Sequence, residues 1–471
     1  MRPTTLQRST LGAFSSGGGA YGVFYNAHYF VLIFYSQILG LDPGLAGLAV
    51  AIGLVLDAIT DPLIGYLSDN THSRWGRRHP WMFASVLPLA MFFYLLWHPP
   101  TFIDGDAELF IWLAVCNVGM RTAMTMFLVP AYALVAELTE DYDGRTHLLT
   151  GFHVVYSVVG NGMSVLMYAI WLVPTDDIAD GVMNASGYQH AGTFGTVVMI
   201  AAIVIFSVGL MRHIPRLRQY QTKRSLGLRQ FYRQTIDVFK SRSARMTTLG
   251  GIMYAAGNGT YVALWVYIYS FFWEFTTEEI AIIAMPMAFA AVILPFVMPR
   301  LIAGRDKKHV AIFAMSTAAL VNLLPIALRL IGFFPENGTT ALLWIMVVAG
   351  FFETILFLTY DIAWQSMVSD LTERTQLETG RRNEGVISST MAFVGKCADG
   401  LGVYIAGLLL ALIAFPTETD VSDVADDVVF DLGLIYGPFV FVIYLGAVAA
   451  LFRYRISRER HGEALRQLSN K

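Results

Sequence analysis

Two aspartates four residues apart, Asp57 and Asp61, lie in an apolar stretch and are followed at once by Pro62. In a helix this spacing places both carboxylates on one face, about one turn apart. Carboxylates that close repel each other unless they share a proton or a cation. Proline has no amide hydrogen, so the carbonyl of Ala58 loses its helical donor and becomes a possible oxygen ligand. The pattern predicts a site for a proton or Na⁺. Pairing with a cationic side chain of a neighbouring helix is the purely structural alternative.

Further ionisable side chains lie deep in apolar stretches, where burial is costly enough to make each one a functional candidate: Arg121, Arg329, Glu353, Asp361, Lys396 and Asp399. Lys396 is the only lysine among them, and a local ion pair with Asp399 is its structural alternative. Structural roles are favoured for Arg121 and Arg329, because long cationic side chains can reach an interface or bridge helices.

Histidine and glycine patterns carry less functional weight. His28 and His153 could relay protons, but a histidine that is hydrogen-bonded to a neighbouring helix is the commoner case. Gly17, Gly19 and Gly22 fit GxGxxG, yet they open an apolar stretch with no strand before them, which favours close helix packing. The chain contains no GxxxxGK[ST], HExxH or GxSxG pattern. We therefore expect no ATP site, no enzymatic activity and no cofactor other than a coupling ion.

The composition places these residues in a membrane. Of the 471 residues, 55% are hydrophobic and 14% are charged, against about 25% charged in ordinary soluble domains. The net charge of −3 gives no basic excess that would attract nucleic acid. Apolar runs of the length that crosses a bilayer recur at 12–39, 44–68, 81–97, 109–136, 148–173, 193–211, 247–273, 280–302, 310–334, 341–368, 385–415 and 432–452. We predict an all-α membrane protein with twelve transmembrane helices.

The distribution of basic residues predicts the orientation. Of the 32 Lys and Arg residues, 29 lie at the termini or at the ends of the even-numbered runs and in the loops after them. The loops after the odd-numbered runs carry acids instead, such as Asp104, Asp106, Asp176, Asp177, Glu418, Asp420, Asp426 and Asp427. By the positive-inside rule both termini face the cytoplasm, and we expect a multi-pass protein of the inner (plasma) membrane.

The chain divides into two similar halves. A basic segment at 212–246 separates a predicted six-helix bundle at 1–211 from a second at 247–452, and a cytoplasmic tail follows at 453–471. The sequence AELTE at 136–140 is echoed by SDLTE at 369–373, 233 residues later. Many secondary transporters are built from such repeats, with the substrate site between them. This pattern favours a transporter.

Several motifs resemble those of the glycoside-pentoside-hexuronide:cation symporters, a family of the major facilitator superfamily. The resemblance rests on DAITDPLIG at 57–65, SRWGRRHPW at 73–81, PAYAL at 130–134, DYDGRT at 141–146 and TGRRNEG at 379–385. It spans nearly the whole chain and implies the two-bundle fold of that superfamily. In the family the basic loop at 74–78 is expected to help close the cytoplasmic side.

The resemblance also implies a cation site. In the family the paired aspartates hold the coupling ion, a threonine of the fourth helix assists and a lysine of the eleventh lies beside them; the matching residues are Asp57, Asp61, Thr125 and Lys396. We assign Lys396 the coupling role. The residue before the second aspartate is often asparagine in sodium users and is Thr60 here. Thr60 therefore joins the predicted cation-binding residues, with H⁺ and Na⁺ both open.

The substrate site departs further from the family. Melibiose permease, its best-known member, grips sugar hydroxyls with carboxylates near an arginine and a tryptophan, and the matching positions here are Tyr21, Leu128, Tyr132 and His153. Asp361 falls where that permease has an aromatic residue. We expect the substrate to present an apolar face to Tyr21, Tyr25 and Tyr132, and a polar end to Asp361 or His153.

Together these patterns predict a cation-coupled symporter that imports a glycoside or related small organic solute by alternating access. A carrier of lysolipids or other amphiphiles is one alternative, since related vertebrate carriers of this fold move lysophospholipids. A sensor or scaffold that transports nothing is another. We expect a monomer whose partners are the substrate and the lipid bilayer, with no nucleic acid.

Overall fold

The computed structural model describes residues 7–103, 105–139, 142–217, 242–302, 305–379 and 384–453. Within these ranges the regular structure is helical and includes no strand, which confirms the all-α fold class. The long helices are α1 (Arg8–Ile33), α2 (Pro43–Asp69), α3 (His79–Trp97), α4 (Asp106–Leu138), α5 (Tyr142–Leu166), α6 (Ala185–Leu210), α9 (Arg242–Tyr267), α10 (Thr277–Ile302), α11 (Lys307–Leu330), α12 (Thr340–Thr379), α13 (Glu384–Leu412) and α14 (Asp426–Phe452). One long helix occupies most of each predicted apolar run.

Nine of these helices are long and apolar enough to cross a membrane, within the part of the chain that the structure describes. The other three are α1, α9 and α10. The helices α1 and α9 begin with polar and small residues, RSTLGAFSSGGG and RSARMTTLGG, which lower their mean hydropathy. The chain is thus a multi-pass helical membrane protein, and twelve crossings remain a prediction.

Helices extend beyond the apolar runs from which they were predicted. The helix α12 continues to Thr379, although the apolar run ends at residue 368. Likewise α9 begins at Arg242, so the last residues of the segment predicted as a linker are helical. Polar residues prolong a helix without changing the length of its apolar stretch, which explains both differences. Most of that linker (218–241) and the predicted tail from residue 454 on lie outside the described residues.

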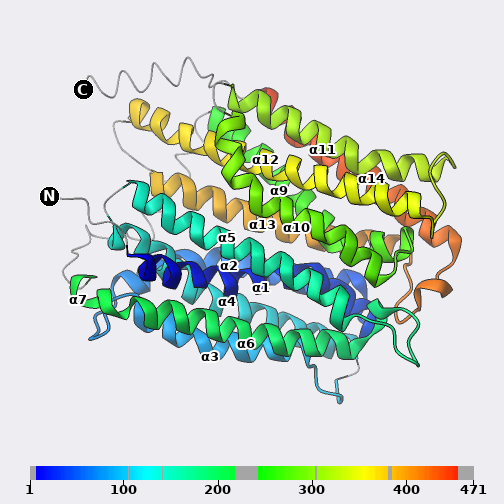
Figure 1. Ribbon diagram of the computed structural model, residues 1–471, viewed down its shortest axis with the longest axis horizontal. Helices are drawn as coiled ribbons and strands as arrows, with labels where there is room; N and C mark the ends of the chain where they lie inside the picture. The colour runs from blue at the N-terminus through cyan, green and yellow to red at the C-terminus, as the bar shows by residue number, and fades with distance from the viewer. Residues whose placement is uncertain are drawn as a thin grey trace. The chain divides into compact units, whose positions relative to one another are not determined.

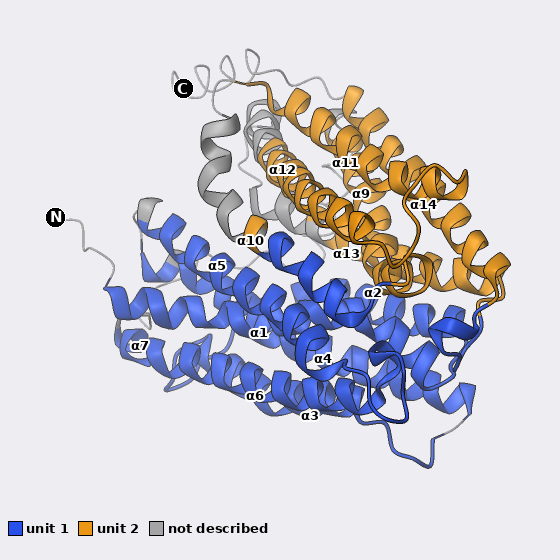
Figure 2. Cartoon of the chain, turned by 45° about the vertical axis from the view of Figure 1, so that its right-hand side comes forward, with its two compact units in different colours: residues 1–225, 275–288, 416–424 blue, residues 226–274, 289–415, 425–471 orange. Residues whose placement is uncertain are grey.

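The chain forms two compact units (Figure 2). Unit 1 comprises Met1–Ser225, Phe275–Ala288 and Pro416–Val424, and unit 2 comprises Leu226–Glu274, Phe289–Phe415 and Ala425–Lys471. Each unit is built mainly from one half of the sequence. Two short segments of the second half, Phe275–Ala288 and Pro416–Val424, group with unit 1. The domain limits proposed from the sequence therefore remain predictions.

The two units pack their helices in the same pattern. In unit 1, α1 packs against α5 and α6, and α3 against α4 and α6. In unit 2, α9 packs against α13 and α14, and α11 against α12 and α14. The helices within each unit run side by side (Figure 1). If α9, α11, α12, α13 and α14 are matched in order with α1, α3, α4, α5 and α6, all four packed pairs correspond.

The first helix of each unit supports this match. The helix α1 has 26 residues and is followed by a π-helical segment of five residues, η1 (Phe34–Ile38). The helix α9 also has 26 residues and is followed by a π-helical segment of five residues, η5 (Ile268–Phe272). The second pair begins 234 residues after the first. The internal repeat suggested by the sequence is therefore a structural repeat.

Glycines bring paired helices into backbone contact. A Cβ atom on Gly18 of α1 would lie 2.2 Å from the carbonyl oxygen of Phe152 on α5, and one on Gly22 would lie 2.6 Å from that of Tyr156. In unit 2 a Cβ atom on Gly402 of α13 would lie 2.1 Å from a main-chain oxygen of α9. Helices this close tolerate only glycine at the contact. The glycines of α1 thus serve helix packing, as predicted.

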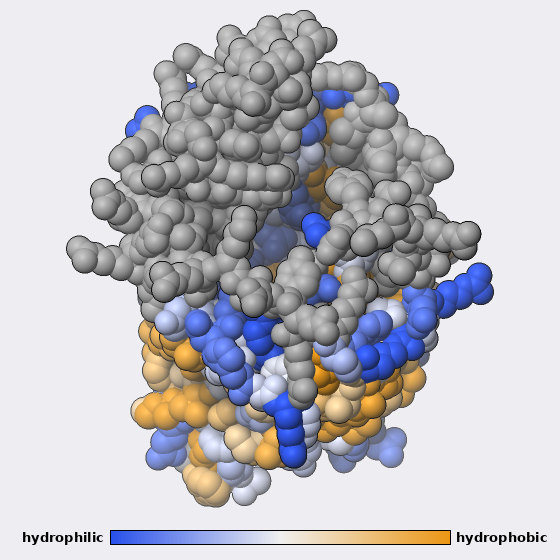
Figure 3. Space-filling view, turned by 90° about the vertical axis from the view of Figure 1, so that its left-hand side faces the viewer, coloured by the Kyte–Doolittle hydropathy of each residue, from blue (hydrophilic) through white to orange (hydrophobic). Residues whose placement is uncertain are grey.

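One end of unit 1 is hydrophilic. At this end, here called the basic end, α1, α3 and α5 begin and α2, α4 and α6 terminate. Figure 3 faces this side of the molecule, and in its coloured part hydrophilic residues gather toward the viewer with hydrophobic residues on the flanks. Such a surface is expected where helices leave an apolar layer.

Candidate functional site

The predicted cation-binding residues of unit 1 lie together. The hydroxyl Oγ1 of Thr125 on α4 is 2.5 Å from Oδ1 of Asp57 and 3.0 Å from Oδ1 of Asp61, both on α2. Asp57 and Thr125 are buried, with 6% and 3% of their surfaces exposed, whereas Asp61 is partly exposed. The helices α2 and α4 pack against each other, so the two turns that carry these side chains face one another.

The chemistry of a hydroxyl limits how this cluster can be charged. A threonine hydroxyl has one hydrogen to donate, and an ionised carboxylate can only accept. Thr125 can therefore donate to Asp57 or to Asp61, but not to both at once. If one carboxyl is protonated, it can donate to Thr125 Oγ1 while Thr125 donates to the other. A cation bound between the oxygens would serve equally well, so the geometry suits a shared proton or a small cation.

A cationic side chain adjoins this cluster. Nη1 of Arg121 lies 4.0 Å from Oδ2 of Asp57, and Arg121 is four residues before Thr125, on the same face of α4. Its Nε donates to Oδ1 of Asn117 at 3.0 Å. Asn117 in turn donates to main-chain carbonyls of α2 at 3.1 and 3.2 Å. Gly53 of α2 makes room, because a Cβ atom there would lie 2.2 Å from Nδ2 of Asn117.

The same arginine contacts a histidine of α1. Nη2 of Arg121 is hydrogen-bonded to Nε2 of His28, and the guanidinium lies over the ring of Phe24 at 5.6 Å. Nδ1 of His28 is 3.1 Å from the carbonyl oxygen of Tyr25. A carbonyl can only accept, so Nδ1 carries the hydrogen and Nε2 accepts from Arg121. This arrangement requires a neutral imidazole, since a protonated one would place two donors and two positive charges in contact.

Charge counting indicates what the site attracts. Asp57, Asp61 and Arg121 together carry a net charge of −1 when all are ionised. Among these three side chains the carboxylates outnumber the guanidinium, and such an arrangement is suited to uptake of a positive charge. Within the part of the chain that the structure describes, no group of three or more His, Cys, Asp or Glu is arranged to hold a metal ion. The oxygens of two carboxylates and a hydroxyl suit H⁺ or Na⁺.

Two other residues predicted for the ion are placed differently. The hydroxyl of Thr60 donates to the main-chain oxygen of Asp57 at 3.1 Å, so its side chain lies along its own helix. Lys396 lies on α13 of unit 2, one helical turn before Asp399. The side chain of Asp399 accepts a hydrogen bond from Asn258 of α9 at 3.5 Å. The cation-binding role of Thr60 and the coupling role of Lys396 remain predictions.

Four of the predicted substrate residues belong to an aromatic cluster of unit 1. The ring of Tyr21 stacks on that of Tyr156 at 5.0 Å, and Tyr25 meets Tyr156 edge-on at 5.9 Å. His153 lies 6.3 Å from Tyr156, measured between ring centroids. Tyr132 contacts Phe152, the neighbour of His153, at 5.3 Å. Tyr132 and His153 are exposed, whereas Tyr21 and Tyr25 are partly buried. The cluster joins α1, α4 and α5.

The fifth predicted substrate residue lies in unit 2. Asp361 of α12 accepts a hydrogen bond from Gln365 at 2.7 Å, one turn further along the same helix. It is partly buried. Its predicted role as the polar anchor of the substrate remains a prediction.

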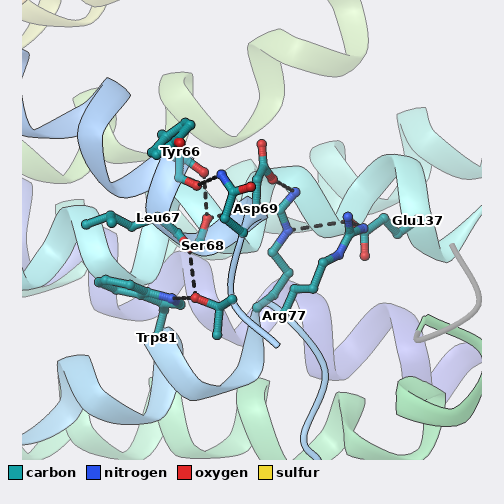
Figure 4. A network of polar contacts seen from close by, with 11 residues as sticks. Tyr66, Leu67, Ser68, Asp69, Arg77, Trp81 and Glu137 are labelled. Carbon is teal, nitrogen blue, oxygen red and sulfur yellow. Dashed lines mark hydrogen bonds and ion pairs between the residues drawn. The ribbon is translucent and has the colours of Figure 1, made fainter. Parts of the chain in front are cut away.

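A network of ion pairs ties three helices together at the basic end (Figure 4). Arg77 Nη2 lies 2.8 Å from Oε1 of Glu137 at the end of α4. The neighbouring Arg78 lies 2.5 Å from Oδ1 of Asp69 at the end of α2 and 3.4 Å from Glu137. Arg78 also donates to the hydroxyl of Ser68 at 2.9 Å. The basic loop that the sequence singled out therefore joins the ends of α2 and α4 to the start of α3.

Sequence reasoning missed several members of these clusters. It favoured a structural role for Arg121 and did not single out Asn117 or Tyr156. The spacing of Asn117, Arg121 and Thr125, four residues each, is a signal that could have placed all three on one helical face. The contact between Arg121 and His28 has no local signal, because it depends on how α1 and α4 are placed.

Comparison with known proteins identifies the family. The model of the family described as MFS/sugar transport protein matches residues 13–458. The chain belongs to this family. It is therefore a membrane transporter of the major facilitator superfamily and not an enzyme, in agreement with the resemblance found in the motifs.

Two relatives align with most of this chain, and a third aligns with less than a third of it. An uncharacterized symporter of Synechocystis is 24% identical and is aligned over 96% of this chain and 95% of its own. The isoprimeverose transporter of Lactiplantibacillus pentosus is 23% identical, over 91% of this chain and 84% of its own. The sodium-dependent lysophosphatidylcholine symporter 1 of Xenopus tropicalis is 34% identical, but over only 31% of this chain and 28% of its own.

Solved structures share the fold. The nucleoside transporter NupG superposes with a TM-score of 0.61 at 14% identity, and the match covers 95% of this chain and all of that one. A likeness at this identity concerns the fold alone.

Proposed function

We propose that this transporter is a cation-coupled symporter that imports a glycoside or a related small organic solute by alternating access. The observation that carries the proposal is the hydroxyl of Thr125 within hydrogen-bonding distance of two carboxylates, Asp57 and Asp61. Such a cluster is costly in an apolar layer unless it takes up a cation. The relatives named as symporters and the sugar transporter among them support both the coupling and the substrate class.

The cation site consists of Asp57, Asp61 and Thr125, with Thr60 contributing from the same turn of α2. Either H⁺ or Na⁺ fits this oxygen set. Lys396 acts as the coupling residue, because its positive charge competes with the ion when it approaches the carboxylates. No other cofactor takes part.

The substrate surface is the aromatic cluster around Tyr21, Tyr25, Tyr132 and His153. Stacked aromatic rings bind the apolar face of a sugar ring or an aryl group well, because they offer a large surface at small entropic cost. The polar end of the substrate meets His153 or Asp361. Melibiose binds poorly, since the carboxylates that grip its hydroxyls in melibiose permease are absent at the matching positions.

A chain of contacts links this surface to the cation site. The ring of Tyr25 lies 5.5 Å from that of His28, and His28 is hydrogen-bonded to Arg121. Arg121 in turn lies 4.0 Å from Asp57. A substrate that displaces Tyr25 alters the environment of Arg121 and hence the affinity of Asp57 for a cation. Coupling of the two sites through one packed network is a general means of linkage between ligands.

The transporter lies in the inner (plasma) membrane as a monomer with both termini in the cytoplasm. The basic residues gathered at the basic end of unit 1, including Arg77 and Arg78, support this orientation, because positive residues favour the cytoplasmic side.

A lysolipid or another amphiphile is the second candidate substrate. Two observations favour it: the partial match to a lysophosphatidylcholine symporter, and the aromatic residues that replace charged groups at the substrate surface. A sensor or scaffold without transport is a third candidate, which a buried cation site does not favour.

Transport by purified protein in liposomes tests the proposal. Addition of an aryl glycoside should alkalinise the medium or drive uptake of radioactive Na⁺, whereas melibiose should do neither. A response to lysolipids alone would establish the second candidate. If no ion moves with any compound of a panel of glycosides, uronides and lysolipids, the symport proposal is wrong.

A further inference from the structure

Unit 2 contains a buried carboxyl group that the proposed symport mechanism does not use. Glu353 lies in the first half of α12, with 5% of its surface exposed. Its Oε1 accepts a hydrogen bond from Nδ2 of Asn322 on α11 at 3.0 Å. Its Oε2 lies 3.3 Å from the hydroxyl of Tyr261 on α9. Three helices of unit 2 thus meet at this carboxyl.

Among the described residues, Glu353 makes its hydrogen bonds with neutral side chains. Its partners are Asn322 and Tyr261, and no lysine, arginine or histidine of these residues is among them. The titratable groups that face it from the packed helices are the phenols of Tyr261 on α9, Tyr269 in η5 and Tyr436 on α14. All three are neutral in ordinary conditions. An ionised carboxylate without a cationic partner is unfavourable in such a place.

A protonated carboxyl fits the same contacts. One oxygen then accepts from the Asn322 amide, and the other donates its hydrogen to the hydroxyl oxygen of Tyr261. The amide of Asn322 can serve either charge state. Its Nδ2 also lies 3.3 Å from the Tyr436 hydroxyl, and its Oδ1 is buried and accepts no hydrogen bond from the described residues. If the side-chain amide of Asn322 rotates by about 180°, its Oδ1 faces Glu353 and can accept a hydrogen bond from the protonated carboxyl group.

The position of Glu353 mirrors that of Arg121 in unit 1. Glu353 is the fourteenth residue of α12, and Arg121 is the sixteenth of the matched helix α4. Glu353 contacts Tyr261, the twentieth residue of α9, just as Arg121 contacts His28, the twenty-first of α1. Each unit therefore holds a buried ionisable group at a similar place along matched helices, and in unit 1 that group adjoins the cation cluster.

We propose that Glu353 is a proton-binding site of unit 2, separate from the cation site of Asp57 and Asp61, and that transport depends on its proton. The carboxyl is protonated in the resting protein. It loses the proton only when the pH of the medium is high or when the helices around it rearrange. The transporter thus carries one ionisable centre in each unit, and the second makes transport sensitive to pH whichever ion the first one binds.

Infrared difference spectroscopy of the purified protein tests the protonation directly. Between acidic and alkaline pH, the wild type should lose a carbonyl band of a protonated, buried carboxyl group. Glu353→Gln should lack this band, because the amide cannot titrate. Glu336→Gln, the same change on an exposed carboxyl beyond the end of α11, is the matched control and should retain it. Coincident spectra of the wild type and Glu353→Gln would overturn the proposal.

Two further measurements keep the proposal open to refutation. Uptake by the wild type and by Glu336→Gln should fall at alkaline pH. In Glu353→Gln this fall should be smaller, because its side chain is permanently neutral and only the dependence on the carboxyls of the cation site remains; identical pH profiles would contradict the proposal. If Glu353→Gln does not fold, Glu353→Asp should shift the frequency of the band, and an unchanged band would overturn the assignment. Loss of the band on addition of Na⁺ at constant pH would identify a sodium site instead.

Discussion

At the residue scale, the hydroxyl of Thr125 limits how two neighbouring carboxyl groups can be hydrogen-bonded and charged. It lies within hydrogen-bonding distance of Asp57 and Asp61 but has a single hydrogen to donate. A proton or cation bound between the two carboxylates is therefore expected to supply the interaction that Thr125 cannot give to both. Removal of the hydroxyl should weaken ion binding more than it weakens the fold, because valine fills the same volume.

Thr125→Val should reduce the apparent affinity for the coupling ion. Loss of one hydrogen-bonding partner in a buried cluster costs about 1–3 kcal/mol, which corresponds to a roughly 5- to 150-fold higher half-saturating ion concentration. The measurement is uptake as a function of Na⁺ concentration or pH. Thr125→Ser keeps the hydroxyl and should stay close to the wild type. Equal ion dependence in the valine and serine variants would exclude Thr125 from the site.

The sequence predicted the members of the cation cluster but not its neighbours. The spacing of Asp57 and Asp61 is a local property of one helix, and the threonine came from the family resemblance. The contact between Arg121 and His28 joins residues 93 positions apart on different helices. Spacing within a helix cannot show which helices lie side by side, so this contact required the structure.

At the element scale, the contact between α1 and α5 depends on glycine. A side chain at Gly18 would meet the main chain of α5 at 2.2 Å, and main chain cannot move aside as the end of a flexible side chain can. The same argument holds for Gly402 between α13 and α9. These close approaches keep the first and fifth helices of each repeat together.

Gly18→Ala should lower the thermal stability of the purified protein. Overpacking of a close contact costs about 1–3 kcal/mol, and the helices must separate to admit the methyl group. Gly12, in the same helix, has no atom within 4 Å of its Cβ position. Gly12→Ala is therefore the matched control, with an unchanged or slightly raised melting temperature. Equal melting temperatures for the two variants would refute the role of the contact.

An acidic loop contact should respond to pH. The carboxylate of Asp180, outside the spanning helices, accepts a hydrogen bond from the amide of Val421 at 3.2 Å. Partial burial raises the pKa of Asp180, and the nearby Asp420 and Asp423 raise it further. The folded protein then binds this proton more tightly than the unfolded chain. Its contribution to stability is therefore favourable at acidic pH and is lost as the pH rises through the raised pKa.

Asp180→Asn should remove this pH dependence. The amide oxygen can still accept from Val421, but the side chain no longer titrates. The difference in melting temperature between the variant and the wild type should grow in favour of the variant as the pH increases from acidic to neutral. A constant difference over this range would show that Asp180 does not contribute.

Hydropathy predicted that the helices exist, but it did not predict the residues at which they begin and end. Apolar runs end where the membrane ends, whereas α12 continues eleven residues past its run, to Thr379. The pairing of helices was also beyond the sequence, because a five-residue echo between the halves indicates a repeat without indicating which helices touch. Glycines such as Gly22 were readable as packing residues because small residues in an apolar helix have few other uses.

At the scale of the whole molecule, each unit contains a buried ionisable centre. Unit 1 holds the buried Asp57 and Arg121 beside the partly exposed Asp61, and unit 2 holds the buried Glu353. Lys396, also in unit 2, is the proposed coupling residue. If Lys396 is the coupling residue, its charge should determine how strongly ion binding depends on pH.

Lys396→Gln should move the pH optimum of transport upward. If the ammonium competes with the ion, as proposed, its removal lets the carboxyls of Asp57 and Asp61 keep their protons to higher pH. Uptake measured over a range of pH in proteoliposomes tests this. An unchanged profile would favour a local role for Lys396 beside Asp399, one turn along the same helix.

The most direct test of the account is gradient-driven accumulation of substrate by proteoliposomes containing Asp57→Asn or Asp61→Asn. Asp42→Asn is the control on the same helix, because Asp42 caps α2 by accepting from Leu45 at 3.0 Å and asparagine caps equally well. The control should accumulate substrate as the wild type does. The other two variants should accumulate none, although they should still exchange substrate in the absence of a gradient. Uphill accumulation at the wild-type level by either of them would contradict the assignment of the cation site.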